Sequence, residues 1–268
     1  MKYIRFFTLL LSLCLLTGCS IVPFQTPEEQ RVAQETADAL KREAQAQADP
    51  FTALESEFTL SRTLTNSAGV RLATYQVAFP KFSENGEKAQ SFSRINKYYE
   101  NEITGLIQDA FSFFGEVKKA YGTEWDTITA ADKAFNIRID YELLEAPEGY
   151  LCVRTDFRVE ENGQTEKYSQ AQVFLLDNGW QLTLEALFGA QYETAAPKLT
   201  ASILAWCKNN GISVTGAETR TIEEFSSNYA LTTDGFLFYT EPFQLNNKNA
   251  NRYTIPVSLS GYRSVLED

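Results

Sequence analysis

The sequence predicts an α+β domain: an antiparallel sheet, arranged as a meander, with a long helix and shorter helices packed on it. Two observations support this class. Residues 91–121 place apolar side chains at spacings of three and four, which is typical of a long amphipathic helix. Several runs between residues 135 and 183 alternate apolar and polar side chains and are separated by turns such as Asn162-Gly163. Such turns between alternating runs indicate antiparallel hairpins.

The chain begins with the pattern of an export signal. Lys2 and Arg5 precede an apolar run at residues 6–16, which ends in Leu16-Thr17-Gly18-Cys19. A membrane-spanning helix needs about 20 apolar residues, so this run fits a signal peptide instead. The tetrapeptide resembles the lipobox of bacterial lipoproteins, which implies a diacylglycerol on Cys19 and cleavage after Gly18. The alternative is an ordinary secretory signal that contains a cysteine.

We therefore expect three segments. Residues 1–18 form the lipoprotein signal peptide, residues 19–50 the lipidated N-terminus and a polar helical tether, and residues 51–268 the α+β domain. The tether opens with Thr26-Pro27-Glu28-Glu29, a capping box with proline at the first helical position. Its apolar face is thin, so we expect a solvated spacer; packing of an amphipathic helix on the domain is the alternative.

Within the domain, each element follows from a local pattern. Residues 57–65 and 70–79 resemble paired strands, and the long helix at 91–121 should end at Gly122 and pack under the sheet. In chain order we then expect strands at 135–143, 151–159, 166–176 and 180–183, helices at 184–188, 194–210 and 221–226, strands at 229–232, 236–240 and 253–257, and a closing helix at 258–266.

Charge and composition exclude several classes of function. Loss of Lys2 and Arg5 with the signal moves the formal net charge from -11 to -13. Such an acidic chain is repelled by nucleic acid and attracts cationic partners. The sequence has no histidine, which excludes Ser-His-Asp and Cys-His catalysis and His-ligated zinc. We therefore expect no enzyme activity, no metal and no cofactor.

The cysteines leave one question open. Cys14 is removed with the signal and Cys19 carries the lipid, so Cys152 and Cys207 remain. Export permits a disulfide between them. Alternation, however, places Cys152 on the polar side of its strand, and Cys207 lies on the apolar stripe of its helix. We favour two separate thiols, of which Cys207 is buried, and keep the disulfide as the alternative.

Carboxylates are the candidate catalytic groups, because glycan hydrolysis needs two of them and no histidine. Asp140 and Glu142 share the polar side of one predicted strand, and Asp156 and Glu160 share that of the next, among Arg138, Arg154 and Arg158. We interpret these residues as cross-strand ion pairs on a solvated face. An enzyme that acts on wall glycan through these carboxylates is the alternative.

Candidate binding residues are few. Glu241-Pro242-Phe243, followed by the Asn-rich residues 246–251, forms the best candidate for a binding loop. Trp125, in a polar setting, is the tryptophan most expected to be exposed. Most other aromatic residues fall at inward positions, where packing explains them.

Several stretches together resemble the extracytoplasmic domain of RsiV-type anti-sigma factors, which also accompanies some polysaccharide deacetylases and occurs in Gram-positive lipoproteins. The stretches are residues 75–80, 95–96, 135–141, 229–239, 241–243 and 253–256. The family's Ala-His pair in a Gly-rich turn is missing, because Gln170-Ala171-Gln172 stands in its place. The sequence also lacks the sensors' cytoplasmic segment and membrane span, so we do not expect it to hold a sigma factor.

The resemblance implies a non-catalytic binding or sensing domain, because the sensors of this family bind lysozyme. We therefore expect a lipid-anchored protein on the outer face of the cytoplasmic membrane. Its expected partner is a cationic, wall-active protein such as lysozyme, or peptidoglycan. A structural accessory to a wall enzyme is a further alternative.

Overall fold

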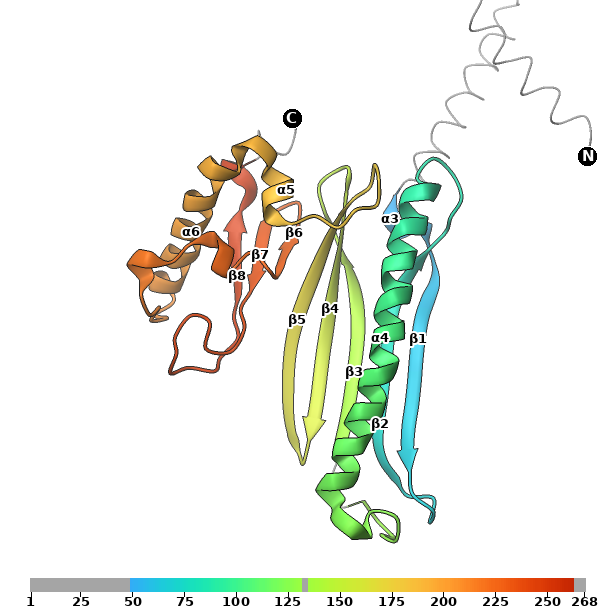
Figure 1. The fold of residues 1–268 in the computed structure, drawn as a ribbon. Coiled ribbons are helices and arrows are strands. Elements are labelled where there is room, and N and C mark those ends of the chain that lie inside the picture. Colours follow the sequence, from blue (N-terminus) through green and yellow to red (C-terminus); the bar gives the residue numbers. More distant parts are fainter. Residues whose placement is uncertain (1–48, 132–134, 263–268) are drawn as a thin grey trace, which may run out of the picture. The chain divides into compact units, whose positions relative to one another are not determined.

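The fold is α+β, as predicted, and it contains two sheets (Figure 1). The computed structural model describes residues 49–131 and 135–262. The predicted signal peptide, the lipidation site Cys19 and the tether up to residue 48 lie outside the described residues, as does the end of the predicted closing helix. No helix in the described part of the chain has the length and apolar character needed to cross a membrane.

The first sheet has five strands in the order in which they occur in the chain. They are β1 (Leu54–Thr65), β2 (Arg71–Phe82), β3 (Phe135–Leu144), β4 (Tyr150–Glu161) and β5 (Gln164–Leu175), and a short helix, α3 (Pro50–Ala53), precedes them. The predicted hairpins β1–β2, β3–β4 and β4–β5 are antiparallel.

The expectation of a wholly antiparallel sheet is wrong at one place, because β2 and β3 pair in parallel. The long helix α4 (Ala89–Tyr121) connects these two strands. It returns the chain to the end of the sheet where β2 began, so β3 starts beside the start of β2, with Ala73 opposite Phe135. A helical crossover between neighbouring strands produces this parallel arrangement.

Helix α4 covers one face of this sheet (Figure 1). Its inward residues Phe92, Ile95 and Tyr99 are buried. Phe92 stacks on Phe82 with ring centroids 5.2 Å apart, and Tyr99 meets Phe79 at 5.1 Å. Full burial of one such side chain stabilises the fold by about 1.5–3 kcal/mol. The helix ends before Gly122, as predicted, where the backbone has a positive φ of 71° that favours glycine.

The second sheet has three short antiparallel strands, β6 (Tyr229–Leu231), β7 (Gly235–Tyr239) and β8 (Thr254–Ser258). Helices α5 (Leu184–Phe188) and α6 (Tyr192–Asn209) precede it and match the predictions closely. The predicted helix at 221–226 is reduced to a single 3-10 turn at Ile222–Glu224. The described part of the predicted helix at 258–266 contains a 3-10 turn at Leu259–Gly261. The predicted strand at 180–183 is reduced to one bridge between Gln181 and Phe174.

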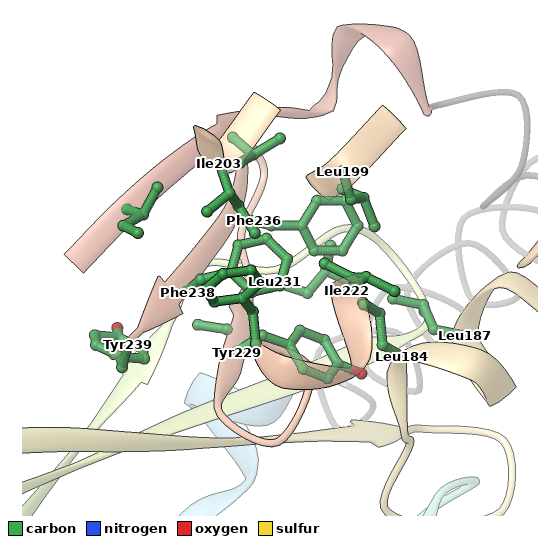
Figure 2. Packing of buried hydrophobic residues seen from close by; sticks show 14 of the residues in the cluster. Leu184, Leu187, Leu199, Ile203, Ile222, Tyr229, Leu231, Phe236, Phe238 and Tyr239 are labelled. Carbon is green, nitrogen blue, oxygen red and sulfur yellow. The ribbon is translucent and has the colours of Figure 1, made fainter. Parts of the chain in front are cut away.

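The core of the second sheet joins its strands to both helices. Figure 2 shows the rings of Tyr229, Phe236 and Phe238 among aliphatic side chains of α5 and α6, including Leu184 and Leu199. The same cluster includes Cys152, Ala171 and Val173 of β4 and β5. The second sheet therefore packs on part of the face of the first sheet that α4 leaves uncovered.

This packing corrects the prediction for Cys152, which is fully buried rather than on a polar side. Its neighbours Leu151 and Val153 face the α4 cluster, while Cys152 faces the second sheet, so β4 is covered on both sides here. Cys152 and the buried Cys207 are both free thiols, so the disulfide alternative is wrong. Burial raises the pKa of Cys152 to about 12, which keeps this thiol protonated and unreactive.

Asn228 holds the edge strand β5 to the second sheet. Its side-chain oxygen accepts a hydrogen bond from the Ala171 backbone N–H at 3.0 Å, and its amide donates to the Ser169 carbonyl, also at 3.0 Å. The buried amide thus satisfies two backbone groups that the sheet edge leaves unpaired. Next to this junction the two sheets diverge and leave a groove.

Candidate functional site

The groove has a volume of about 490 Å³. Strands β3, β4 and β5 supply one wall, on the sheet face opposite α4. The end of β7 and the segment at residues 252–254 supply the other wall. This volume lies within the range of about 300–1,000 Å³ that small-ligand sites occupy. The lining contains four basic side chains and two acidic ones.

Three of the basic side chains form a row across the sheet. Arg138 on β3 lies directly opposite Arg158 on β4, and Arg158 lies directly opposite Lys167 on β5. Side chains at directly opposed positions point to the same face of a sheet. Like charges in such positions are destabilising, so local stability does not explain this row.

The two carboxylates of the groove occupy the next row, where Asp140 lies opposite Asp156 and Asp156 opposite Ser169. Arg138 donates to Asp140 at 2.6 Å, and Arg154 donates to Asp156 at 3.0 Å and to Glu142 at 2.5 Å. Ser169 also donates to Asp156, at 2.6 Å. The Arg154–Glu142 pair confirms the predicted cross-strand pairing at one place. The pairs of Asp140 and Asp156 instead lie within one strand, and Glu160 accepts from Asn136 and not from an arginine.

This pairing bears on the enzyme alternative. A general acid of a glycosidase needs its pKa raised, usually by an apolar pocket. Asp140 and Asp156 are instead partly exposed and bound to arginine. Their surroundings are those of structural ion pairs.

Arg158 and Lys167 differ from the other basic residues of the groove. Within the described part of the chain, no carboxylate lies within 4.0 Å of either side chain. The remaining arginine, Arg252, donates to Glu166 at 2.9 Å and also to Glu241. The ring of Tyr168 lies under the guanidinium of Arg252, with its centroid 4.3 Å away. Arg252 is therefore held in place on both sides.

Tyr239, at the end of β7, has a hydroxyl that lies near the Arg154 guanidinium and finds no acceptor among the described residues. The side chain lines the groove and is only 7% exposed. In Figure 2 it lies apart from the packed rings of Phe236 and Phe238. Burial raises the pKa of Tyr239 to about 12, although the charge of Arg154 and a hydrogen bond donated by Arg154 act in the opposite direction. The hydroxyl is therefore protonated and available as a donor.

The structure places the predicted binding residues in two different regions. Glu241 lies beside the groove, bound to Arg252. Pro242 is half-buried, and Phe243 is 55% exposed. Trp125 is half-buried against the cluster around Val117, with the Lys118 ammonium 4.3 Å from its ring centroid.

The prediction that Trp125 is the exposed tryptophan is therefore wrong. Trp180 is 60% exposed, and its ring lies under the Arg94 guanidinium at 4.2 Å. The polar residues around Trp125 suggested exposure, but the end of α4 packs against its ring.

No pattern considered in the sequence indicated Lys167, Tyr239 or Arg252 as a site residue. One signal could have identified Lys167. In a hairpin closed by the two-residue turn Asn162-Gly163, each residue lies opposite the one that is equally far from the turn on the other strand. Lys167, four residues after Gly163, therefore lies opposite Arg158, four residues before Asn162. Tyr239 and Arg252 reach the groove only because the second sheet packs beside β5, and no local pattern indicates this contact.

The row of like charges leads to a stability prediction. Lys167→Glu replaces a repulsive cross-strand contact with Arg158 by an attractive one, so we expect the free energy of unfolding to rise by about 0.2–1 kcal/mol. Urea unfolding followed by circular dichroism would measure this change. Lys198→Glu, on the exposed face of α6, is the matched control and should change stability less. A loss of stability confined to Lys167→Glu would contradict the prediction.

Comparison with known proteins gives a likeness of fold. No protein-family model matches the sequence, and no curated protein matches it. The crystal structure of a DUF3298 family member from Bacteroides fragilis is similar, with a TM-score of 0.51 and 14% identity over 79% of this chain and 92% of that chain. A DUF3298 family protein from Pseudomonas aeruginosa has a TM-score of 0.41 and 10% identity over 78% and 92% of the two chains. The structural neighbours are thus DUF3298 family proteins, and the first supports a shared fold.

Proposed function

We propose that this chain is a lipoprotein of the bacterial envelope whose folded domain binds a partner and does not catalyse a reaction. As the resemblance to RsiV-type ectodomains implies, the proposed partner is a cationic, wall-active protein such as lysozyme. The lipid on Cys19 would hold the domain at the outer face of the cytoplasmic membrane. One structural observation carries the binding proposal, the conformation of Phe243.

Phe243 is an exposed aromatic residue with a constrained backbone. Its φ is 64°, in the left-handed region that residues other than glycine rarely adopt. Such a conformation costs about 1–3 kcal/mol and persists only where surrounding contacts fix it. The Phe243 N–H donates to the Asn249 carbonyl at 3.1 Å, and the Glu241 N–H donates to the side chain of Gln244 at 2.8 Å. The ring is thus presented to solvent on an ordered loop.

The charge around the loop suits a basic partner. The side chain of Gln244 donates to the Glu224 carbonyl, so the loop adjoins a segment with exposed carboxylates at Glu223 and Glu224, of which Glu224 is paired with Arg220. The net charge of -13 expected for the mature chain acts over a longer range. Opposite net charges raise encounter rates by about 10 to 1,000-fold at low salt. A rigid aromatic anchor then decides how long the complex lasts.

The test is the binding of lysozyme to the mature chain without its lipid, residues 20–268, at low and physiological salt. We expect the association rate to fall strongly as salt rises. Phe243→Ala should speed dissociation by about 30-fold, the equivalent of a 2 kcal/mol hot spot, and change association little. Alanine at 243 must adopt the same φ, so the variant tests the ring and not the turn.

Phe111→Ala is the matched control, because Phe111 on α4 is 61% exposed and lies outside the loop. It should leave both rate constants unchanged. Absence of lysozyme binding at low salt would refute the proposed partner. Equal binding to unrelated basic proteins, unaffected by Phe243→Ala, would reduce the effect to unspecific charge attraction.

A further inference from the structure

The groove is a basic site on an acidic protein. Aspartate and glutamate number 35 in the sequence against 24 lysines and arginines, so partners for a basic side chain are abundant. Arg158 and Lys167 nevertheless lie side by side without a carboxylate partner in the described residues. Repulsion between neighbouring cations is relieved when an anion binds between them.

The two carboxylates of the groove do not cancel this charge. Asp140 is paired with Arg138, and Asp156 is paired with Arg154 and accepts from Ser169. Arg252 contacts two carboxylates, Glu166 and Glu241. Arg158 and Lys167 are thus the two basic side chains of the groove that no carboxylate of the described residues contacts. Exposed charges beyond about 8 Å are largely screened at physiological salt, so an anion in the groove would interact mainly with the side chains that line it.

A neutral donor accompanies the unpaired cations. The Tyr239 side chain is more than nine-tenths buried, lines the same groove and has no acceptor for its O–H in the described residues. A buried hydroxyl without a partner costs about 1–3 kcal/mol of stability. Such a group in a natural protein calls for a ligand or an ordered water. The threonines at 240 and 254 add polar lining to the same wall.

We propose that the groove binds an oxyanion carried by a hydroxyl-rich ligand, that is, a fragment of an acidic glycan. Arg158 and Lys167 bind the anionic oxygens, and the Tyr239 hydroxyl donates to a further oxygen of the same ligand. A volume of about 490 Å³ accommodates a small oligosaccharide fragment. The same chemistry is supplied by a sugar carboxylate or by a polyol phosphate. This site is separate from the Phe243 loop and does not depend on lysozyme binding.

The first experiment is titration calorimetry of residues 20–268 with three probes: a galacturonate oligosaccharide, poly(glycerol phosphate) and a neutral galactose oligosaccharide. We expect binding of at least one anionic probe, weakened by salt, and no binding of the neutral one. A higher affinity for either anionic probe would identify the carboxylate or the phosphate as the source. Absence of binding to both anionic probes at millimolar concentration would overturn the proposal.

The second experiment locates the site. The double variant Arg158→Gln with Lys167→Gln should weaken binding of the anionic probe at least tenfold. Lys198→Gln with Lys208→Gln, which removes two exposed lysines of α6, is the charge-matched control and should leave the affinity unchanged. Equal weakening in both double variants would show unspecific attraction and would overturn the assignment.

The third experiment separates a ligand contact from a structural role. Tyr239→Phe should weaken binding of the anionic probe about tenfold, the loss expected for a hydrogen bond to a charged group, without lowering the unfolding midpoint. Tyr229→Phe is the control, because the Tyr229 hydroxyl donates to the Leu182 carbonyl at 3.0 Å. It should lower the midpoint and leave the affinity unchanged. Unaltered affinity in Tyr239→Phe would remove Tyr239 from the site.

Discussion

Gly235→Ala is expected to destabilise the domain by about 3 kcal/mol or more, which is a large part of the roughly 5–15 kcal/mol that stabilises a typical domain. Gly235 opens β7, with φ 152°. A Cβ atom at this position would lie 2.1 Å from the Val257 carbonyl oxygen and 2.9 Å from the Leu259 nitrogen. Both atoms belong to the backbone of the adjacent β8 region, so no side chain can rotate to relieve the overlap. Urea unfolding and the thermal midpoint would measure the loss.

Gly163→Ala provides the matched control for this close approach. Gly163 also lies in a hairpin turn and has a φ of 79°, but no atom lies within 4 Å of the position that a Cβ would occupy there. Only the cost of a positive φ for alanine then destabilises the variant, by about 1–2 kcal/mol. Equal losses in the two variants would show that backbone conformation, and not overlap with β8, determines the effect at Gly235.

Cys19→Ala is expected to abolish lipid labelling and membrane attachment. A thiolate is the nucleophile that accepts the lipid, and no other cysteine follows a lipobox in the sequence. Stable anchoring needs two acyl chains, which the diacylglyceryl group supplies. A variant without this group therefore has no stable membrane anchor. Labelling of cells with radioactive palmitate, followed by fractionation, would measure both effects.

Cys14→Ala is the control for this experiment, because Cys14 lies within the predicted signal peptide and should not carry lipid. It should label like the wild type. Equal palmitate labelling of Cys19→Ala and the wild type would contradict the proposed anchor and favour an ordinary secretory signal.

The elements of the fold were largely predictable, because each depends on local patterns. The spacing along α4 and its end at Gly122, the hairpin at Asn162-Gly163 and the helix at 184–188 all follow from neighbouring residues. The parallel pairing of β2 with β3 was not predictable in this way, because it depends on the end of the sheet to which α4 returns the chain. The burial of Cys152 depends in the same way on the distant second sheet.

The candidate site was predictable only in part. The alternating charges on β3 and β4 indicated a polar face, and the predicted cross-strand pairing was confirmed for Glu142, whereas Asp140 and Asp156 pair within their own strands. The groove itself requires Tyr239 and Arg252 to face that surface from a second sheet. This contact joins residues far apart in the sequence, and it is created by apolar packing and by the Asn228 amide, not by a motif.

The parallel contact between β2 and β3 also has a consequence for how the chain folds. The hairpins β1–β2 and β3–β4–β5 join strands that are close in sequence, whereas Ala73 and its partner Phe135 are separated by the whole of α4. Contacts of long sequence separation require closure of a long loop before they gain energy, and they slow folding. We therefore expect the two hairpin units and α4 to form early. Docking of β3 against β2 would then limit the folding rate, and substitutions at that junction would slow folding, with φ-values well above zero.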